Sequence, residues 1–557
     1  MEKAWLKSYP EGVPSEISLN EFSSLVDLFD KTCERFNNKI AFTNFGVGIS
    51  FNQLKNYSEN LSSYFLNDLK LSKGDRVSIM MPNILQYPIS TFAILKTGLV
   101  VDNINPLFTP RELKSQLNDS GSETIIIAEN FAFNLQKIIH ETSVKNIIIT
   151  SLGDFIGFKG QVINFVLKYI KKMVPRYNLP NTINFKKALS DGSKYNFEEQ
   201  SIDIEDIAFL QYTGGTTGGI KAAILSHRNI LANTIQVREW LGNQLRFGED
   251  TAICALPLYH IFALTCNSMV FFYFGANNIL ITNPRDIPGF VRELKKYRFT
   301  FISGVNTLFN KLLDEPTFSS CDFSKLNISI AGGMPVQKSV GDRWQKITGC
   351  VLVVGYGLSE TAPAASIDPI NGKAFSDSIG LPLPSTEMCI QNEKGKILSA
   401  GEVGEICIRG PQVMRGYWKK EEETIKVLTK DGWFKTGDVG LMQENGFFEI
   451  VDRKKDMIII SGFNVFPSEI EEVAMLHEKV LEAGCIGIIN SQGQEEVKLF
   501  VSIKESHDIT KDEIIEHCKK NLTAYKVPKS LEIVSEIPKS NVGKILRREL
   551  REKNQNA

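Results

Sequence analysis

The clearest candidate for chemistry in this chain is a segment rich in glycine and threonine. It reads Tyr212-Thr-Gly-Gly-Thr-Thr-Gly-Gly-Ile-Lys221 and follows a run, DIAFLQY, that is expected to form a strand. Glycines let the backbone approach an anion closely, while hydroxyls and a lysine add donors and positive charge. The segment therefore predicts a phosphate-binding loop. Its expected contributors are Thr213, Gly214, Gly215, Thr216, Thr217, Gly218, Gly219 and Lys221.

This segment differs from the phosphate-binding loop of P-loop kinases in two respects. The kinase loop reads GxxxxGK[ST], whereas here the lysine comes one position later, at Lys221. The residues that follow, AAILSHRN (222–229), read as a strand before a helix, and not as a helix that opens at the loop. A P-loop kinase is therefore disfavoured. A flexible surface turn is the other alternative, and the three threonines and the lysine argue against it.

Four more motifs follow in order along the chain. They are Gly355-Tyr-Gly-Leu-Ser-Glu-Thr361, Trp433-Phe-Lys-Thr-Gly-Asp438, Asp452-Arg-Lys-Lys-Asp-Met-Ile-Ile-Ile-Ser-Gly462 and Pro538-Lys-Ser-Asn-Val-Gly-Lys-Ile-Leu546. With the loop, they resemble the signature motifs of the adenylate-forming ligases, the superfamily of acyl-CoA synthetases and luciferases. The resemblance extends over essentially the whole chain. The resemblance is most detailed to the bacterial long-chain fatty acid-CoA ligases, at residues 5–17, 257–265 and 431–471.

The resemblance implies a reaction in two halves. A carboxylate attacks the α-phosphorus of ATP to give acyl-AMP and pyrophosphate, and the thiol of coenzyme A then displaces AMP. A long-chain fatty acid, ATP, Mg²⁺ and coenzyme A are thus the expected small molecules. A fatty acid is already ionised at pH 7, so no general base or covalent nucleophile is needed. Positioning and electrostatics should carry the rate, because two anions must meet.

The resemblance also assigns nucleotide-binding roles. Glu360 is expected to hold Mg²⁺, which prefers hard oxygen ligands, and Ser359 to donate to the α-phosphate. Asp438 and Arg453 would bind the ribose hydroxyls. The alternative for Asp438 is a simple turn residue. Tyr356 would stack on adenine, unless it is a core tyrosine. Glycines would leave room for the nucleotide at Gly332, Gly333 and Gly357.

Further residues are implied for the acyl and coenzyme A halves of the reaction. His260 resembles a family position that faces the carboxylate, and a core histidine is the alternative. Lys544 would enter the active site during adenylation. Its alternative is a solvated basic face, because Lys539, Arg547 and Arg548 are close by in the sequence. The C-terminal domain is expected to rotate about Lys455 between the half-reactions, with Gly462 lining the coenzyme A channel.

Strand and helix patterns alternate over most of the chain, which indicates an α/β fold. Strands are predicted at 76–81, 123–128, 146–150, 206–212, 299–303 and 351–355, and helices at 227–241, 288–297 and 335–347. We expect a large N-terminal AMP-binding domain (1–452) of two α/β subdomains plus a small β-barrel after about residue 378. A hinge (453–456) and a small mobile α+β C-terminal domain (457–557) follow. The last part reads β-α-β-β-α-β with a basic tail.

Composition narrows the class of protein. The chain has 63 Lys plus Arg and 64 Asp plus Glu, a net charge of -1, which excludes a globally basic nucleic-acid coat. The nine cysteines are scattered without metal-ligand spacing, as in a reducing compartment. No signal peptide is evident, and the apolar run 264–281 contains too many polar residues to span a bilayer. It reads as a core helix followed by a strand. A cytoplasmic protein that needs no nucleic acid is expected.

A basic amphipathic stretch suggests contact with a membrane. Residues 155–190 contain seven Lys or Arg and no Asp or Glu, with apolar residues interleaved. Such a stretch is expected at an anionic lipid surface, here the inner face of the cell membrane. A solvated helix face is the alternative. A homodimer is also left open.

Three other functions are alternatives to a long-chain fatty acid-CoA ligase. A ligase for aryl or short acids would differ in its acyl substrate. A fatty-acid binder with an inactive nucleotide site is disfavoured because Lys221, Glu360, Asp438, Arg453 and Lys544 are all intact. A carrier-loading domain is disfavoured because no carrier segment follows residue 557. The apolar run 261–274 could line an acyl tunnel or be a core helix.

Overall fold

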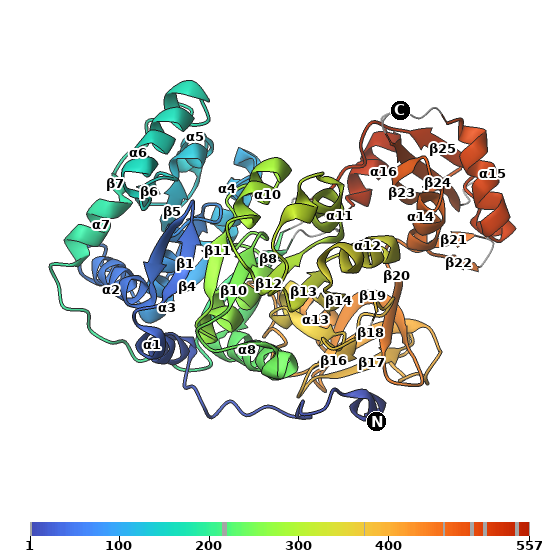
Figure 1. Ribbon diagram of the computed structural model, residues 1–557, viewed down its shortest axis with the longest axis horizontal. Helices are drawn as coiled ribbons and strands as arrows, with labels where there is room; N and C mark the ends of the chain where they lie inside the picture. The colour runs from blue at the N-terminus through green and yellow to red at the C-terminus, as the bar shows by residue number, and fades with distance from the viewer. Residues whose placement is uncertain are drawn as a thin grey trace.

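The computed structural model describes residues 3–213, 220–372, 374–460, 463–490, 495–504, 509–540 and 545–555. Two large α/β sheets form the body of the molecule, with a smaller antiparallel sheet beside them and an α+β unit at the C-terminal end (Figure 1). This is the α/β architecture that the alternating pattern predicts. The strands predicted from the sequence correspond to β3, β5, β6, β8, β12 and β14, and the predicted helices to α8, α10 and α12.

The first large sheet has seven strands in the order β7-β6-β5-β3-β4-β8-β9. Its strands are parallel except for β9, which pairs antiparallel with β8. Because helices cover both faces of such a sheet, side chains on both sides of each strand are buried, and the strand sequences are nearly continuous apolar runs. The strands are β3 (Arg76–Met80), β4 (Val100–Asn103), β5 (Thr124–Ala128), β6 (Asn146–Thr150), β7 (Thr182–Asn184), β8 (Ile207–Thr213) and β9 (Lys221–Ser226). The helices between β2 and β8 are α2 (Phe51–Asn67), α3 (Gln86–Lys96), α4 (Pro110–Ser120), α5 (Ala132–Gln136), α6 (Gly157–Phe165) and α7 (Phe185–Gly192).

The second large sheet has nine strands in the order β16-β15-β14-β13-β12-β10-β11-β1-β2. They are β1 (Ile40–Asn44), β2 (Val47–Ser50), β10 (Thr251–Cys254), β11 (Asn277–Leu280), β12 (Phe301–Gly304), β13 (Ile328–Gly332), β14 (Leu352–Gly357), β15 (Ala364–Ile367) and β16 (Leu381–Pro382). Its helices are α1 (Leu25–Phe36), α8 (His227–Leu241), α9 (Ile261–Thr265), α10 (Ile287–Leu294), α11 (Asn306–Asp314) and α12 (Lys338–Thr348).

The two large sheets share one aromatic core. The ring of Phe29 on α1 stacks on Phe92 of α3 at a centroid distance of 4.1 Å and on Phe272 at 5.5 Å. Phe272 belongs to the apolar run 264–281, which forms helical turns and then β11, as predicted. Buried aromatic contacts of this kind stabilise the packing of the two halves beyond the area they bury.

The smaller sheet and the C-terminal unit complete the chain. The small β subdomain is a four-stranded antiparallel sheet of β17 (Glu387–Gln391), β18 (Gly404–Arg409), β19 (Phe434–Met442) and β20 (Phe448–Arg453), with α13 (Glu421–Val427) between β18 and β19. The C-terminal unit contains β21 (Ile458–Ile460), β22 (Phe463–Val465), α14 (Pro467–Met475), β23 (Val480–Ile489), β24 (Glu495–Ile503), α15 (Lys511–Asn521), β25 (Ser530–Ile533) and α16 (Arg547–Gln555).

The C-terminal unit follows the predicted β-α-β-β-α-β order, with a hairpin, β21–β22, as its first β element and α16 as the basic tail. β20 ends at Arg453 and β21 begins at Ile458, on either side of the expected hinge. The exact boundaries 452/453 and 456/457 stay predictions. All nine cysteines are buried and free. No helix within the described ranges is long and apolar enough to cross a membrane.

Candidate active site

The ends of the glycine-rich loop are fixed by the β8–β9 hairpin. Thr213 and Lys221 are cross-strand partners, and the Thr213 hydroxyl donates to the Lys221 carbonyl at 3.4 Å. Lys221 opens β9, and α8 begins at His227, so the strand-then-helix prediction for residues 222–229 is confirmed. The loop residues themselves lie outside the described residues. These are Gly214, Gly215, Thr216, Thr217, Gly218 and Gly219.

The Lys221 ammonium is paired with a carboxylate that sequence reasoning does not identify. Its Nζ lies 2.5 Å from Oε2 of Glu423 on α13 and 5.3 Å from the ring centroid of Tyr417. The hydrogen bond from Lys221, helped by Lys426, lowers the pKa of Glu423 to about 2. Lys221 therefore presents an ammonium whose charge is balanced within the protein, so a phosphate must compete with Glu423 for it.

Glu360 lies in a short 3₁₀ helix, Ser359–Thr361, directly after β14. It is only 8% exposed, and the Tyr417 hydroxyl donates to its Oε1 at 2.8 Å. Burial raises the pKa of Glu360, and the hydrogen bond from Tyr417 opposes that shift. The neighbouring Thr361 hydroxyl donates to backbone carbonyls of the same turn, so it shapes the turn that carries Glu360. Ser359 is half-buried beside it.

The surroundings of Glu360 fit a magnesium ion held mostly by substrate. In the described part of the chain, no three His, Cys, Asp or Glu side chains gather into a metal site. Mg²⁺ commonly takes one or two carboxylates and completes its shell with phosphate oxygens and water. A single buried carboxylate that shares the contact residue Tyr417 with Lys221 suits that pattern.

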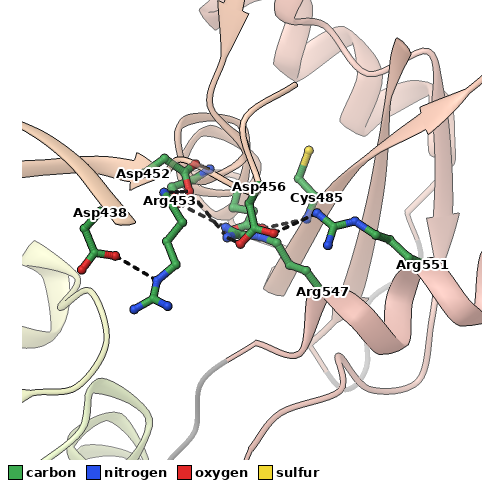
Figure 2. A network of polar contacts seen from close by, with 9 residues as sticks. Asp438, Asp452, Arg453, Asp456, Cys485, Arg547 and Arg551 are labelled. Atoms are coloured by element: carbon green, nitrogen blue, oxygen red, sulfur yellow. Dashed lines mark hydrogen bonds and ion pairs between the residues drawn. The ribbon is translucent and has the colours of Figure 1, made fainter. Parts of the chain in front are cut away.

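Asp438, Arg453 and Tyr356 come together at the start of the hinge region. Asp438 and Arg453 are cross-strand partners on β19 and β20, with Arg453 Nε 3.0 Å from Asp438 Oδ1 (Figure 2). The Tyr356 hydroxyl donates to the other oxygen, Oδ2, at 2.7 Å. Asp438 is 3% exposed, and these two contacts hold both of its oxygens in a fixed direction. The structure thus groups three of the residues predicted to surround the nucleoside.

The three glycines predicted around the nucleotide are required by the backbone itself. A Cβ at Gly357 would lie 1.9 Å from the Pro363 carbonyl oxygen, and one at Gly332 would lie 2.7 Å from that of Gly355. Gly333 has a φ of +76°, which favours glycine. Their role in admitting adenine stays a prediction, because close backbone contacts at Gly332 and Gly357 and the positive φ of Gly333 already explain why these residues are glycine.

His260 caps the N-terminus of α9. Its Nδ1 accepts the Phe262 N–H at 3.3 Å, and burial lowers its pKa to about 4. The ring is therefore neutral at pH 7 and carries its proton on Nε2. The run 261–274 after it is buried except for the half-buried Phe262 and Tyr273, so most of it is core helix. Its use as an acyl tunnel stays a prediction.

Comparison with known proteins identifies the family. A family model described as "AMP-binding enzyme" matches residues 29–418, and one described as "AMP-binding enzyme C-terminal domain" matches 469–544. The chain belongs to the AMP-binding enzymes. It is 51% identical over 553 residues to a long-chain-fatty-acid–CoA ligase of Salmonella typhimurium, covering 99% of this chain and 98% of the relative. It is 36% identical over 554 residues to one of Bacillus subtilis, with the same coverage.

Two solved structures share the fold. The anthranilate CoA ligase AuaEII in complex with anthranoyl-AMP superimposes with a TM-score of 0.83 at 22% identity, covering 96% of this chain and 98% of that one. ATP-bound MatB from Rhodopseudomonas palustris gives a TM-score of 0.77 at 25% identity, covering 95% and 99%. The α/β fold class inferred from the sequence motifs is thereby confirmed.

The residues predicted to form the hinge of this AMP-binding enzyme lie in a charged network. Burial, with Arg453 and Arg551 nearby, lowers the pKa of Lys455 to about 8, against the opposing effect of Asp456. The adjacent Asp456 carboxylate accepts hydrogen bonds from Arg547 and Arg551 (Figure 2). The hinge role of Lys455 stays a prediction. Gly462 and Lys544, predicted for the coenzyme A channel and for adenylation, lie outside the described residues.

Sequence reasoning did not identify Tyr417 and Glu423 as site residues. They come from the segment Arg415-Gly-Tyr-Trp418 and the acidic start of α13, between β18 and β19. The sequence pattern that could have indicated them is a glycine and two aromatic residues next to a charged run, in a segment that lies outside all the recognised motifs. That pattern alone does not show which site the segment contacts.

Proposed function

We propose that this AMP-binding enzyme is an ATP-dependent ligase that converts a long-chain fatty acid to acyl-AMP and then to acyl-CoA. It releases pyrophosphate in the first step and AMP in the second. The observation that carries the proposal is one juxtaposition. The Lys221 ammonium and the buried Glu360 carboxylate both contact Tyr417. Lys221 opens β9, the strand that follows the predicted phosphate loop, and Glu360 lies in the turn after β14. Relatives at about half identity over the full length are named long-chain-fatty-acid–CoA ligases.

The first half-reaction forms a bond between a fatty-acid oxygen and the α-phosphorus and breaks the bond to pyrophosphate. Lys221 would exchange Glu423 for the phosphates and reduce the repulsion between the two anions. Asp438, held by Arg453 and Tyr356, would accept hydrogen bonds from the ribose hydroxyls. Glu360 would hold Mg²⁺, which supplies positive charge to the phosphates when it is bound.

His260 would orient the fatty-acid carboxylate in this step. A neutral imidazole with its proton on Nε2 can donate one hydrogen bond to the carboxylate without forming an ion pair with it. The carboxylate therefore keeps its negative charge and remains a nucleophile. In the second half-reaction the sulfur of coenzyme A forms a bond to the acyl carbonyl carbon and its proton passes to solvent. The bond from that carbon to the phosphate oxygen breaks, and AMP leaves with the bonding electrons.

We assign the adenylation lysine to Lys544 and not to Lys539. Lys539 forms an ion pair with Glu482, and its backbone pairs antiparallel with that of Ile545, so it stabilises the C-terminal unit. Changing Lys544→Ala should slow acyl-AMP formation by ~10²–10³, the usual effect of removing one preorganised donor. It should leave conversion of supplied acyl-AMP to the thioester intact. Lys539→Ala is the matched control, and an equal loss in both half-reactions would refute the role of Lys544.

The substrate assignment is tested by a panel of acids. Pyrophosphate release is measured with ATP, Mg²⁺ and coenzyme A for fatty acids of increasing chain length, for acetate and for benzoate. We expect the highest kcat/KM with long-chain acids. A preference for benzoate or acetate would overturn the long-chain assignment, while leaving the AMP-forming chemistry in place.

We further propose that the enzyme works on the inner face of the cell membrane, through α6 and the turn after it. Six large apolar side chains are exposed within 16 residues of chain, a density found nowhere else among the described residues. They are Phe158 (78%), Val162 (49%), Phe165 (57%), Tyr169 (63%), Ile170 (65%) and Met173 (54%). The lysines interleaved with them, Lys159, Lys168, Lys171 and Lys172, are exposed as well. Apolar insertion with cationic flanks is typical of peripheral attachment to anionic lipid.

Vesicle flotation tests this attachment. The protein should float with vesicles containing phosphatidylglycerol and much less with neutral vesicles. The triple variant Lys168→Gln, Lys171→Gln, Lys172→Gln should lose that preference. The triple variant Lys394→Gln, Lys396→Gln, Lys520→Gln removes the same charge from other exposed positions and should keep it. Equal flotation of the two variants would refute the proposal. Size-exclusion chromatography with light scattering decides whether a homodimer forms.

A further inference from the structure

The segment 414–418 is fixed by its backbone to both sides of the candidate site. Arg415 N–H donates to Ile224 O at 3.1 Å, Ile224 N–H to Gly416 O at 2.9 Å, and Trp418 N–H to Ala222 O at 2.9 Å. These bonds align the segment along β9, the strand that Lys221 opens. Met414 N–H donates to Glu360 O at 2.8 Å. The backbone therefore fixes the place of residue 417 relative to both Lys221 and Glu360.

Tyr417 uses this placement to contact two groups of opposite charge. Its hydroxyl donates to Glu360 Oε1 at 2.8 Å, and its ring centroid lies 5.3 Å from Lys221 Nζ. Its own N–H donates to the Thr424 hydroxyl at 2.9 Å, which ties it to α13. The side chain is 8% exposed. A buried ring of this kind has little freedom to leave either partner.

We propose that Tyr417 is a positioning residue that orients the Glu360 carboxylate for a divalent cation and supports the Lys221 ammonium beside it. The inference rests on the proposed function and adds a residue to it. A carboxylate with one oxygen held by a charge-assisted hydrogen bond cannot rotate freely, so its remaining acceptor sites keep one direction. The ring face attracts the ammonium through its quadrupole. One side chain thus contacts both charged groups.

The variant Tyr417→Phe separates these two contributions, because it keeps the ring and removes the hydroxyl. Binding of Mn²⁺ is measured by electron paramagnetic resonance, with an ATP analogue whose α,β-bridging oxygen is replaced by methylene. We expect the Mn²⁺ dissociation constant to rise about tenfold, the effect of losing one hydrogen bond to a charged group. The Mg²⁺ concentration for half-maximal acyl-AMP formation should rise in parallel. Thioester formation from supplied acyl-AMP should stay within about twofold.

Tyr9→Phe is the matched control. It deletes a hydroxyl that donates to the Pro382 carbonyl and to neither Glu360 nor Lys221, and it should leave Mn²⁺ binding unchanged. In a Glu360→Gln background, Tyr417→Phe should have no further effect on Mn²⁺ binding, because the two residues act as a unit. Independent effects in the double variant would overturn the proposal.

The outcomes also separate this proposal from the proposed function. Unchanged Mn²⁺ binding in Tyr417→Phe would refute the positioning role while the wild-type enzyme still makes acyl-CoA. A loss of fold in Tyr417→Phe, seen by circular dichroism, would also refute it, because an isosteric change at a positioning residue should spare the fold. If the wild-type protein binds no Mn²⁺ with the ATP analogue, the proposed function itself fails.

Discussion

At the residue scale, the charged members of the candidate site already have protein partners. Lys221 pairs with Glu423, Glu360 accepts from Tyr417, and Asp438 is held by Arg453 and Tyr356. Side chains held in this way need little reorganisation when charge develops, which is how electrostatic preorganisation accelerates a reaction. The same contacts mean that substrate must exchange with a protein group at Lys221.

The neutral state of His260 leads to a prediction about pH. Burial disfavours the imidazolium and lowers its pKa to about 4, so the ring gains its proton only below that pH. His260→Gln keeps one N–H donor and should keep most of the adenylation rate, whereas His260→Ala should lose about tenfold, the worth of one hydrogen bond. The pH profiles of wild type and His260→Gln should coincide between pH 5.5 and 8, measured by pyrophosphate exchange. A step near pH 6.5 in the wild type alone would contradict a neutral His260.

At the element scale, the sequence predicts helices, strands and hairpins, but it does not predict contacts between residues that are far apart in the chain. The strands around the loop follow from β-branched runs and glycine punctuation, and the β8–β9 hairpin brings Thr213 and Lys221 together as the motif requires. Glu423 lies 202 residues from its partner Lys221, and Tyr417 lies 57 residues from Glu360. No local pattern records such pairings, because they depend on how β9 packs against the segment before α13. The phosphate-binding role of residues 214–219 and the adenylation role of Lys544 remain predictions that rest on their motifs alone.

The contact between α13 and β9 predicts an effect on nucleotide affinity. Glu423→Gln removes the negative charge that competes with phosphate for Lys221, so the KM for ATP should fall by about two- to fivefold, the range for a solvent-accessible ion pair. Steady-state kinetics at saturating fatty acid measure it. The adjacent Glu422→Gln makes the same charge change at an exposed position and serves as the control. A rise in KM for Glu423→Gln would show instead that Glu423 is needed to hold Lys221 in place.

At the scale of the whole molecule, one arginine joins the C-terminal unit to the strand before the hinge. Arg547 on α16 lies 3.1 Å from Asp456 and 3.6 Å from Asp452 (Figure 2). It also lies 2.8 Å from Glu471 of α14. Asp452 belongs to β20 and also accepts the Ser468 N–H of α14 at 2.7 Å. The network therefore spans the expected hinge, and any rotation about it must rearrange these contacts.

Removing Arg547 should destabilise the C-terminal unit more than removing an exposed arginine, because Arg547 neutralises buried carboxylates. Arg547→Ala would leave three carboxylates, each at most 7% exposed, without their shared cation, and breaking a buried pair typically costs about 3–5 kcal/mol. Pulse proteolysis in urea should show the C-terminal unit unfolding at a lower midpoint, while the two large sheets keep theirs. Arg548→Ala is the control, since Arg548 is 59% exposed and contacts only Glu552 among the ion pairs of the described residues. Equal midpoints for the two variants would mean that the carboxylates are protonated or hydrated when Arg547 is removed. In that case Arg547 does not hold α16 to the residues around the expected hinge.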